Sequence, residues 1–432
     1  MARQVKKDLL KTPRGTRDLW GEEILLFEKI ERAAENLARF YGFKKIKTPH
    51  FEHAELFEAS LGEASDIVEK QMYTFRTRGG DRLTLRPEGT VPLVRAYFEH
   101  GMQALPQPLM FYYSGSFFRH ESPQKGRFRE FGQFGLEILG EEGAVADATI
   151  IRVSQLILQE LKLAPVLELN TIGDKECRPA YRKELVTYYR KHINYLCKDC
   201  KRRLKDNPLR ILDCKEPACR ELREKAPQMI EYVCEECKNH FKAVLDFMDA
   251  LELPYRLNPY LVRGLDYYTR TVFEFTVETN AEGISRRLEI GGGGRYDHLA
   301  PVLASKELAA SGVALGLDRI AELLREGGEG ADGTERAKVF LIQLGEAAKR
   351  KSLSLMEDFR KAKIPLAQSL SKDSLRGQLK IAAKVGADFS LIMGQKEAMD
   401  GTIIIREMDS GAQEALPFSK VIERLRLKIK SL

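Results

Sequence analysis

FRHESPQKGRFREFGQFGLEILG, residues 118–140, has the pattern of a strand, a basic loop and a second strand. Side chains alternate between the two faces of a strand, so Gly115, Phe117 and Arg119 are expected to share one face of the first strand. The second strand should present Phe131, Gln133, Gly135 and Glu137 together. Guanidinium groups pair bidentately with phosphate oxygens, so this hairpin suits a polyphosphate and a small polar substrate. The alternative is an exposed basic hairpin with solvated charges.

The whole chain has the size and composition of a globular protein with more than one domain. Its 432 residues predict two or three domains, and 43% of them are hydrophobic while 31% are charged. No run of eighteen apolar residues occurs, and the basic start lacks the apolar core of a secretory signal. Membrane insertion is therefore not expected, and the cytoplasm is the expected location. The net charge of +7 permits a nucleic-acid partner without requiring one.

Strand-like segments separated by turns favour an α+β domain with an antiparallel sheet over residues 1–325. Short strands are expected near 72–76, 82–86, 109–117, 130–139 and 270–279, and helices near 22–41, 91–100, 146–161 and 312–324. A helix-rich, highly charged segment at about 175–252 is unlike its neighbours and indicates an insertion. Two distant halves of the chain would then complete one sheet.

The C-terminal part has a different pattern. Residues 326–337 are rich in glycine and contain no large apolar residue, as in a flexible linker. From 338 to 432, apolar strands alternate with charged helices, which predicts a separate α/β domain with helices on its sheet.

The seven cysteines are clustered, which in a reducing compartment suggests a metal rather than disulfides. Two Cys-x-x-Cys pairs, at Cys197 with Cys200 and at Cys234 with Cys237, supply four thiolates that suit a structural, tetrahedral zinc. However, 33 residues lie between Cys200 and Cys234, more than the roughly 15 to 20 of a common zinc ribbon. Unligated thiols are the alternative.

Several polar groups stand at turns where a ligand can reach them. Glu88 and Thr90 follow a strand in LTLRPEGTV, although such side chains often hydrogen-bond their own backbone. Tyr267 and Tyr268 are adjacent, so one should face the core and the other a pocket. The glycines of GGGGRYD, residues 291–297, permit close approach of a ligand or a neighbouring strand and do not form a phosphate-binding P-loop. Arg319 stands in an apolar helix, where ion pairing is the simpler reading.

Together these segments resemble the class II aminoacyl-tRNA synthetases, and within them the bacterial histidyl-tRNA synthetase family, over essentially the full chain. RGTRDL at 14–19 is similar to the family's amino-terminal signature, and Pro49 stands where motif 1 has its proline. FRHESPQKGRFREF resembles motif 2, and GVALGLDRI resembles motif 3. LVRGLDYY and GGGGRYD resemble the two stretches that set histidyl enzymes apart, and the tail resembles an anticodon-binding domain.

For ATP, the resemblance implies that Arg119 holds the α-phosphate while Glu121 and Phe131 hold the adenine. Arg127 and Arg319 would hold the γ-phosphate, with Mg²⁺ accompanying the nucleotide. Arg263 would stabilise the reacting α-phosphate, so Arg263 and Arg119 are the expected catalytic residues.

For histidine, the resemblance implies a polar pocket with separate partners for the amino group and the imidazole. The expected binding residues are Glu88, Gly89, Thr90, Arg119, Gln133, Glu137, Arg263, Tyr267, Tyr268 and Tyr296. Glu137 and Tyr268 are assigned to the imidazole, because both of its nitrogens need partners.

The implied activity is a histidine-tRNA ligase that forms histidyl-adenylate and then esterifies tRNA(His), acting as a homodimer. The alternative is the synthetase-like regulatory subunit of ATP phosphoribosyltransferase, a non-catalytic histidine-binding protein. That alternative typically lacks the C-terminal domain and the intact RGLDYY sequence, both of which are present here. The cysteine set is not part of the resemblance, so zinc is not implied by the family.

Overall fold

The computed structural model describes residues 10–62, 65–123, 126–281, 284–328, 338–370 and 373–430. It divides into two compact units, Met1–Ala331 and Asp332–Leu432. Most of the expected linker at 326–337 lies outside the described residues. No helix in these ranges is both long and apolar enough to cross a membrane.

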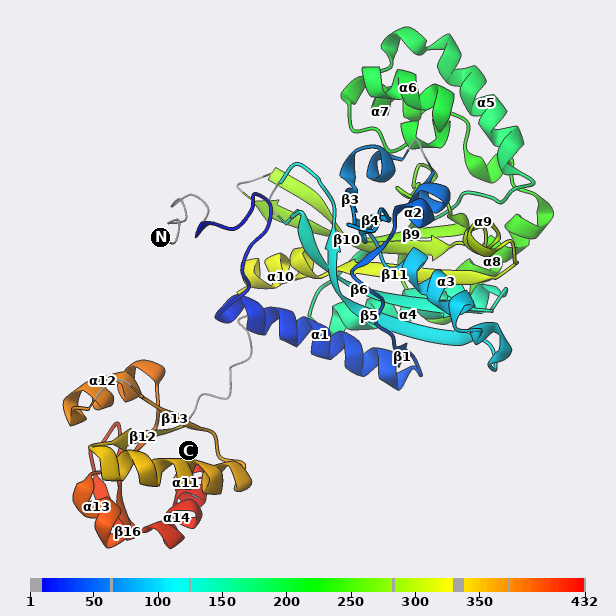
Figure 1. The fold of residues 1–432 in the computed structure, drawn as a ribbon. Helices are drawn as coiled ribbons and strands as arrows, with labels where there is room; N and C mark the ends of the chain where they lie inside the picture. The colour runs from blue at the N-terminus through cyan, green and yellow to red at the C-terminus, as the bar shows by residue number, and fades with distance from the viewer. Residues whose placement is uncertain are drawn as a thin grey trace. The chain divides into compact units, whose positions relative to one another are not determined.

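The first unit is built on an eight-stranded sheet in the order β1-β5-β6-β11-β10-β9-β7-β8 (Figure 1). Its strands are β1 (Lys44–Lys45), β5 (Leu109–Phe118), β6 (Glu130–Leu139), β7 (Val166–Thr171), β8 (Tyr255–Leu257), β9 (Thr269–Ala281), β10 (Ile284–Arg295) and β11 (Ala310–Gly316). Pairing is antiparallel from β5 to β7, and only the edge strands β1 and β8 pair in parallel. The expected antiparallel sheet, completed by two distant halves of the chain, is confirmed.

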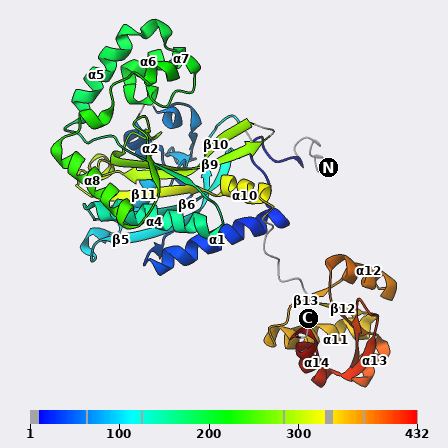
Figure 2. The same cartoon turned by 180° about the vertical axis from the view of Figure 1, so that it is seen from behind.

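One face of this sheet is covered by four helices that enclose the main core (Figure 2). They are α1 (Glu22–Phe40), α4 (Ala144–Glu160), α8 (Glu235–Ala250) and α10 (Leu317–Glu326). Tyr112, Phe134 and Leu136 point from the strands into this core. The segment 312–324, expected to be helical throughout, is instead β11 followed by α10. Its first residues pair with both β6 and β10, and these ladder hydrogen bonds override the helical pattern.

The other face carries a smaller core and several short elements. These are α2 (Ala54–Leu61), η2 (Ile67–Gln71), α3 (Thr90–Glu99), η3 (Met102–Ala104), α9 (Leu299–Ala304) and a three-stranded sheet of β2 (Phe51–His53), β4 (Arg82–Leu85) and β3 (Tyr73–Arg76). Phe111 and Leu139, of opposite parity to the residues in the main core, point to this side. The two faces therefore bury different halves of the same strands.

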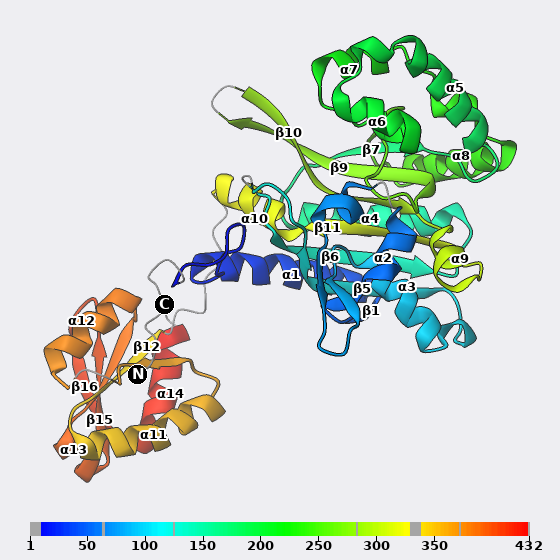
Figure 3. The ribbon, with the colours of Figure 1, turned by 45° about the horizontal axis from the view of Figure 1, so that its top comes forward.

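A helical insertion follows β7 and forms its own group in Figure 3. Its elements are α5 (Arg178–Lys191), η4 (Ile193–Tyr195), α6 (Lys198–Asp206), η5 (Pro208–Ile211), α7 (Pro217–Arg223) and η6 (Met229–Glu231). It has a separate small core that contains Tyr181, Leu185 and Tyr189. Helix α8, expected within the insertion, instead packs Phe241 and Val244 into the main core.

The second unit has a five-stranded sheet in the order β13-β12-β14-β15-β16. Its elements are β12 (Val339–Gln343), α11 (Glu346–Lys361), β13 (Leu366–Gln368), α12 (Leu375–Val385), β14 (Phe389–Met393), α13 (Gln395–Asp400), β15 (Thr402–Glu407), β16 (Gln413–Pro417) and α14 (Phe418–Lys430). Strands β13, β12 and β14 are parallel, and β15 and β16 add antiparallel to them. This α/β arrangement agrees with the expected fold class.

Candidate active site

One pocket of the first unit gathers side chains from distant parts of the chain. Its lining includes the expected residues Glu88, Gly89, Thr90, Arg119, Glu121, Arg127, Phe131, Gln133, Arg263, Tyr267, Tyr268 and Arg319. Glu137 and Tyr296 lie one layer deeper, because Glu137 is hydrogen-bonded to the lining residues Thr90 and Tyr113 and to Tyr296. The structure thus brings all the expected residues to one place, while their individual roles stay predictions.

The hairpin of β5 and β6 supplies the first guanidinium group. Phe117 pairs with Phe131, and Gly115 with Gln133, which fixes the register of the hairpin. Arg119 follows β5, and its Nε donates to the carbonyl oxygen of Pro87 at 2.9 Å. Its guanidinium carbon lies 5.3 Å from the centre of the Phe131 ring. Arg119 is therefore held beside an aromatic face at the edge of the pocket.

Arg263 lies across the glycine-rich strand β10. Its Nη1 is 3.0 Å from Glu274 Oε2 and 3.0 Å from Glu289 Oε1. A Cβ atom at Gly292 would stand 2.5 Å from this Nη1, so a glycine is required for the arginine to lie there. The buried Nε of Arg263 has no hydrogen-bond acceptor among the described residues, which leaves a donor for a ligand.

Arg319 lies in the first turn of helix α10 and contacts the same carboxylate, that of Glu289. Its Nη1 donates to the backbone oxygen of Glu289 at 2.5 Å and lies 3.4 Å from the Glu289 side chain. Burial opposes ionisation of Glu289, but Arg263 and Arg319 outweigh it and lower its pKa. Burial, and then the charge of Glu289, raise the pKa of Glu274 to about 7. Glu289 therefore stays ionised between two arginines, whereas Glu274 is ready to hold a proton.

The opposite side of the pocket is built from a buried carboxylate and hydroxyl groups. Glu137 is only 1% exposed. It accepts hydrogen bonds from Thr90 Oγ1 at 2.9 Å, Tyr113 Oη at 3.0 Å and Tyr296 Oη at 2.6 Å. Burial raises the pKa of Glu137 to about 8, although these donors favour the ionised form. This side therefore holds a carboxylate whose charge is sensitive to its surroundings near neutral pH.

Glu88 has both a structural and a pocket-facing position. Its carboxylate accepts the backbone N–H groups of Thr90 and Val91, each at 2.8 Å, where helix α3 begins. Tyr267 Oη also donates to it, at 3.2 Å, and burial raises its pKa. Glu88 therefore hydrogen-bonds the backbone of its own turn, as the alternative reading of the sequence expected, and it also lines the pocket.

Tyr113 is a pocket residue that the sequence interpretation missed. Its ring lies against Gly89 and Gly135, where a Cβ atom would approach the ring to 2.3 and 2.1 Å. In the sheet Tyr113 pairs directly with Gly135. The signal was available, because Tyr113 has the same parity as Phe117 and faces a glycine on the partner strand. Glu289 was missed for a different reason, since nothing local distinguishes it from a solvated charge.

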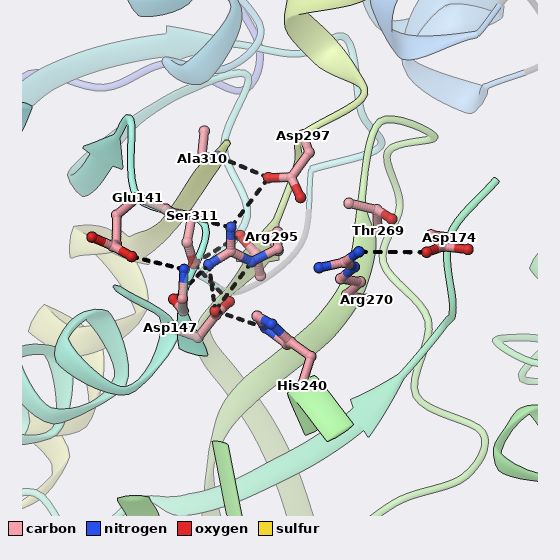
Figure 4. A network of polar contacts seen from close by, with 12 residues as sticks. Glu141, Asp147, Asp174, His240, Thr269, Arg270, Arg295, Asp297, Ala310 and Ser311 are labelled. Atoms are coloured by element: carbon pink, nitrogen blue, oxygen red, sulfur yellow. Dashed lines mark hydrogen bonds and ion pairs between the residues drawn. The ribbon is translucent and has the colours of Figure 1, made fainter. Parts of the chain in front are cut away.

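A buried polar network fixes the end of β10 (Figure 4). Arg295 is fully buried, and its Nη2 lies 2.7 Å from Asp147 Oδ2. Asp147 also accepts from Ser311 Oγ at 3.0 Å and contacts His240 Nε2 at 3.1 Å. Arg295 is followed in the chain by Tyr296, whose hydroxyl group donates to Glu137. The network therefore positions a pocket hydroxyl without lining the pocket itself.

The expected zinc set of Cys197, Cys200, Cys234 and Cys237 is wrong in its pairing. The two Cys-x-x-Cys pairs fall into separate clusters, one with Cys214 and Cys219 and the other with Asp174 and Cys177. The reason is the chain path: Cys197 begins α6 inside the insertion, whereas Cys234 begins α8, which packs on the main domain.

An antiparallel sheet that presents arginines and buried carboxylates at one pocket, together with a separate α/β domain, defines a class II aminoacyl-tRNA synthetase. A family model described as "Histidyl-tRNA synthetase" matches residues 15–320, and one described as "Anticodon binding domain" matches residues 338–428. The chain belongs to the histidyl-tRNA synthetase family.

Relatives and a solved structure agree with this assignment. The chain is 42% identical to a histidine–tRNA ligase of Pelotomaculum thermopropionicum, covering 96% of this chain and 97% of the relative. It is also 42% identical to one of Dehalococcoides mccartyi, covering 98% and 100%. The apo structure of histidyl-tRNA synthetase from S. aureus superposes with a TM-score of 0.79 at 33% identity, covering 96% of this chain and 99% of that one.

Proposed function

We propose that this chain activates L-histidine with ATP and transfers the histidyl group to the 3′ end of tRNA(His). The observation that carries the proposal is the pocket itself. Arg263 and Arg319 stand on one side of it around Glu289, Arg119 lies beside Pro87 and Phe131, and Glu88 and Thr90 line it with Glu137 behind them. The first side suits a triphosphate and the second a small polar cation, so both substrates of the first step have complementary surfaces.

In the first step, a histidine carboxylate oxygen forms a bond to the α-phosphorus of ATP, and the bond to the leaving pyrophosphate breaks. Negative charge then spreads over the phosphate oxygens. Arg119 and Arg263 are proposed to stabilise this charge, since preorganised guanidinium groups do so without reorganising. Arg127 and Arg319 are proposed to hold the γ-phosphate, with Glu121 and Phe131 at the adenine. In the second step, a terminal ribose hydroxyl of the tRNA attacks the histidyl carbonyl and AMP leaves.

Histidine is proposed to bind on the carboxylate side. Glu88, Gly89, Thr90 and Gln133 would receive the amino group, and the buried Gln133 Oε1 has no hydrogen-bond partner within the described part of the chain. Glu137, supported by Tyr296, and Tyr268 would meet the two imidazole nitrogens, with Tyr267 beside them. An amino acid without both nitrogens would leave buried polar groups unsatisfied, which is a strong basis for rejection.

Further parts of the proposal concern partners and ions. Mg²⁺ would accompany ATP, and Glu289, between Arg263 and Arg319, offers the oxygen ligand that Mg²⁺ prefers. The unit that carries the anticodon-binding family match would contact the tRNA, in the cytoplasm, where translation takes place. A homodimer is proposed from family membership, and sedimentation of the purified chain tests it. The cysteine clusters are proposed to hold zinc.

Histidine-dependent exchange of pyrophosphate into ATP tests the activity. Exchange should require histidine and fail with each other amino acid, and the protein should then charge tRNA(His) transcript. Histidine binding without exchange would instead favour the regulatory-subunit alternative. Exchange driven by a different amino acid would show that the chosen imidazole partners are wrong.

A further inference from the structure

We propose that this chain binds two structural zinc ions, at separate sites with different ligands and different roles. The hub site, inside the insertion, consists of Cys197, Cys200, Cys214 and Cys219. The neck site, where the insertion joins the main domain, consists of Asp174, Cys177, Cys234 and Cys237. Together the two sites use all seven cysteines of the chain.

The distances between the donor atoms fit tetrahedral zinc. In each cluster the four donors lie within 4.8 Å of one another. Cys197 Sγ is 3.8 Å from Cys214 Sγ, and Cys177 Sγ is 3.8 Å from Cys237 Sγ. A zinc–sulfur bond of about 2.3 Å in tetrahedral geometry requires sulfur atoms about 3.8 Å apart. A disulfide would need about 2.05 Å, and all seven cysteines are free thiols.

Backbone N–H groups already point at the sulfur atoms. The N–H of Cys200 donates to Cys197 Sγ at 3.4 Å, and the N–H of Cys197 donates to Cys219 Sγ at 3.3 Å. In the neck site, the N–H of Asp174 donates to Cys177 Sγ at 3.2 Å. Hydrogen bonds from the surrounding backbone stabilise the charge of ligating thiolates and orient them toward a metal.

The packing of the insertion supports a metal in the hub site. Helix α7 buries Cys219 alone, and helix α6 buries only Cys200 and Leu204. Such short, charged helices remove little apolar surface from water, so hydrophobic burial gives them little reason to dock. Zinc ligation supplies folding free energy to small units of this kind. The residues that these helices do bury are chiefly the proposed ligands.

The neck site has a different position and a different expected effect. Asp174 and Cys177 follow β7, while Cys234 and Cys237 begin α8, so one ion would fasten both ends of the insertion. Arg270 Nη2 lies 3.6 Å from Asp174 Oδ2, an ion pair drawn in Figure 4, and the backbone N–H of Arg270 donates to the Gly173 carbonyl. Loss of the ion would therefore disturb the start of strand β9.

The residue immediately before this strand, Tyr268, belongs to the active-site pocket. Arg178, next to Cys177, donates from Nη2 to the backbone oxygen of Tyr268 at 2.7 Å. Tyr268 lines the pocket, so the neck site is a positioning element for it. Both sites supply four ligands and leave no open coordination position, which suits structural ions rather than catalytic ones.

The number of zinc ions tests the proposal directly. The full chain, purified with zinc and passed over a weak chelator, should carry two ions per chain by elemental mass spectrometry. The variants C197S/C200S and C234S/C237S should each retain one. Matched controls are D199N and E235Q, which change exposed carboxylates beside the same cysteines and should retain both.

One ion in the wild-type chain and none in either double variant would indicate one shared site and overturn the proposal. No zinc at all, or disulfides found by thiol titration without reductant, would overturn it too.

Cobalt substitution of the wild-type chain keeps the test decisive if a variant fails to fold. Four thiolates, and three thiolates with one carboxylate, give Co²⁺ ligand-field bands at different wavelengths, so two band sets are expected. D174A should change only the band set of the neck site, where water can replace the lost carboxylate, and one band set in the wild-type chain would contradict two sites.

The positional role of the neck site rests on the proposed function and has its own readout. C234S/C237S should raise the KM for histidine in the exchange assay, while C197S/C200S should leave it unchanged. Equal KM values for histidine in both variants would contradict the proposal that the neck site positions Tyr268, without affecting the conclusion from the zinc count. If no exchange occurs in any chain, the proposed function fails and the zinc count still stands.

Discussion

The two sides of the pocket hold their charges in opposite ways. On one side Arg263 and Arg319 meet carboxylates directly, with Glu289 between them, so cations are fixed in place by ion pairs. On the other side three hydroxyl groups donate to Glu137 among the described residues, and burial raises its pKa to about 8. The arginines of the first side can therefore pair with phosphate oxygens, whereas Glu137 on the second side can gain or lose a proton when a ligand binds. Removing one group at a time separates the two.

Removal of Arg263 should have the largest effect. The variant R263A loses a preorganised donor to the α-phosphate, so single-turnover adenylation should slow by about 10²- to 10³-fold, or ~3 kcal/mol. Rapid-quench measurement of adenylate formation checks this. R256A is the control, because Arg256 is exposed on the same sheet and pairs with Glu278. A normal rate in R263A would contradict the assigned role.

A change at Glu137 should act on histidine alone. In E137Q an amide nitrogen faces hydroxyl donors that need an acceptor, so the KM for histidine should rise by about 1–2 kcal/mol, roughly 5- to 30-fold. The KM for ATP should stay within about twofold, since the nucleotide side is untouched. E130Q, at the exposed start of the same strand, is the control. An equal rise in the KM values for histidine and ATP would contradict a role of Glu137 in histidine binding alone.

The pH dependence of histidine binding should follow the same carboxylate. In the free protein Glu137 keeps its proton below a pH of about 8, and the ionised carboxylate accepts an imidazole N–H more strongly than the protonated group does. Between pH 7 and 9 the KM for histidine should therefore fall by about tenfold relative to E137Q, in which this group does not titrate. Identical pH profiles would show that Glu137 does not change charge on binding.

The smallest effect is expected at Glu274, on the arginine side. Its folded-state pKa of about 7 lies above the ordinary value of 4.5, so stability falls as pH rises from 4.5 through about 7, and the last part of this loss occurs above pH 6. The wild-type chain should lose about 1 kcal/mol of unfolding free energy over this pH range, and E274Q should not show that loss. Thermal melts of both chains at pH 6 and 8.5 measure it, and an equal pH dependence would argue against the raised pKa.

Sequence patterns were informative where a residue's surroundings are local. The alternation in β5 and β6 predicted the hairpin and the common face of Gln133 and Glu137, because strand geometry has a fixed period of two. The same rule failed for 312–316, where apolar residues fit either a buried strand or a helix. Pairing with β6 and β10 decided in favour of the strand.

Partners distant in sequence were the part that could not be predicted from the residues. The three hydroxyl donors to Glu137 lie 24, 47 and 159 residues away. The carboxylates that hold Arg263 look like ordinary surface charges in the sequence. The cysteine pairing was wrong for the same reason, because spacing along the chain does not say which helix starts meet.

By itself, the sequence determined the family, the two-unit organisation expected of it and the residue types available for the chemistry. These follow from local periodicity and from ordered motifs that a chain carries wherever it folds. Only the tertiary structure decided which charges neighbour one another, hence the opposite pKa shifts of Glu274 and Glu289 and the division of the cysteines. Electrostatic energy and metal ligation depend on distances of a few ångströms through space, which chain packing sets.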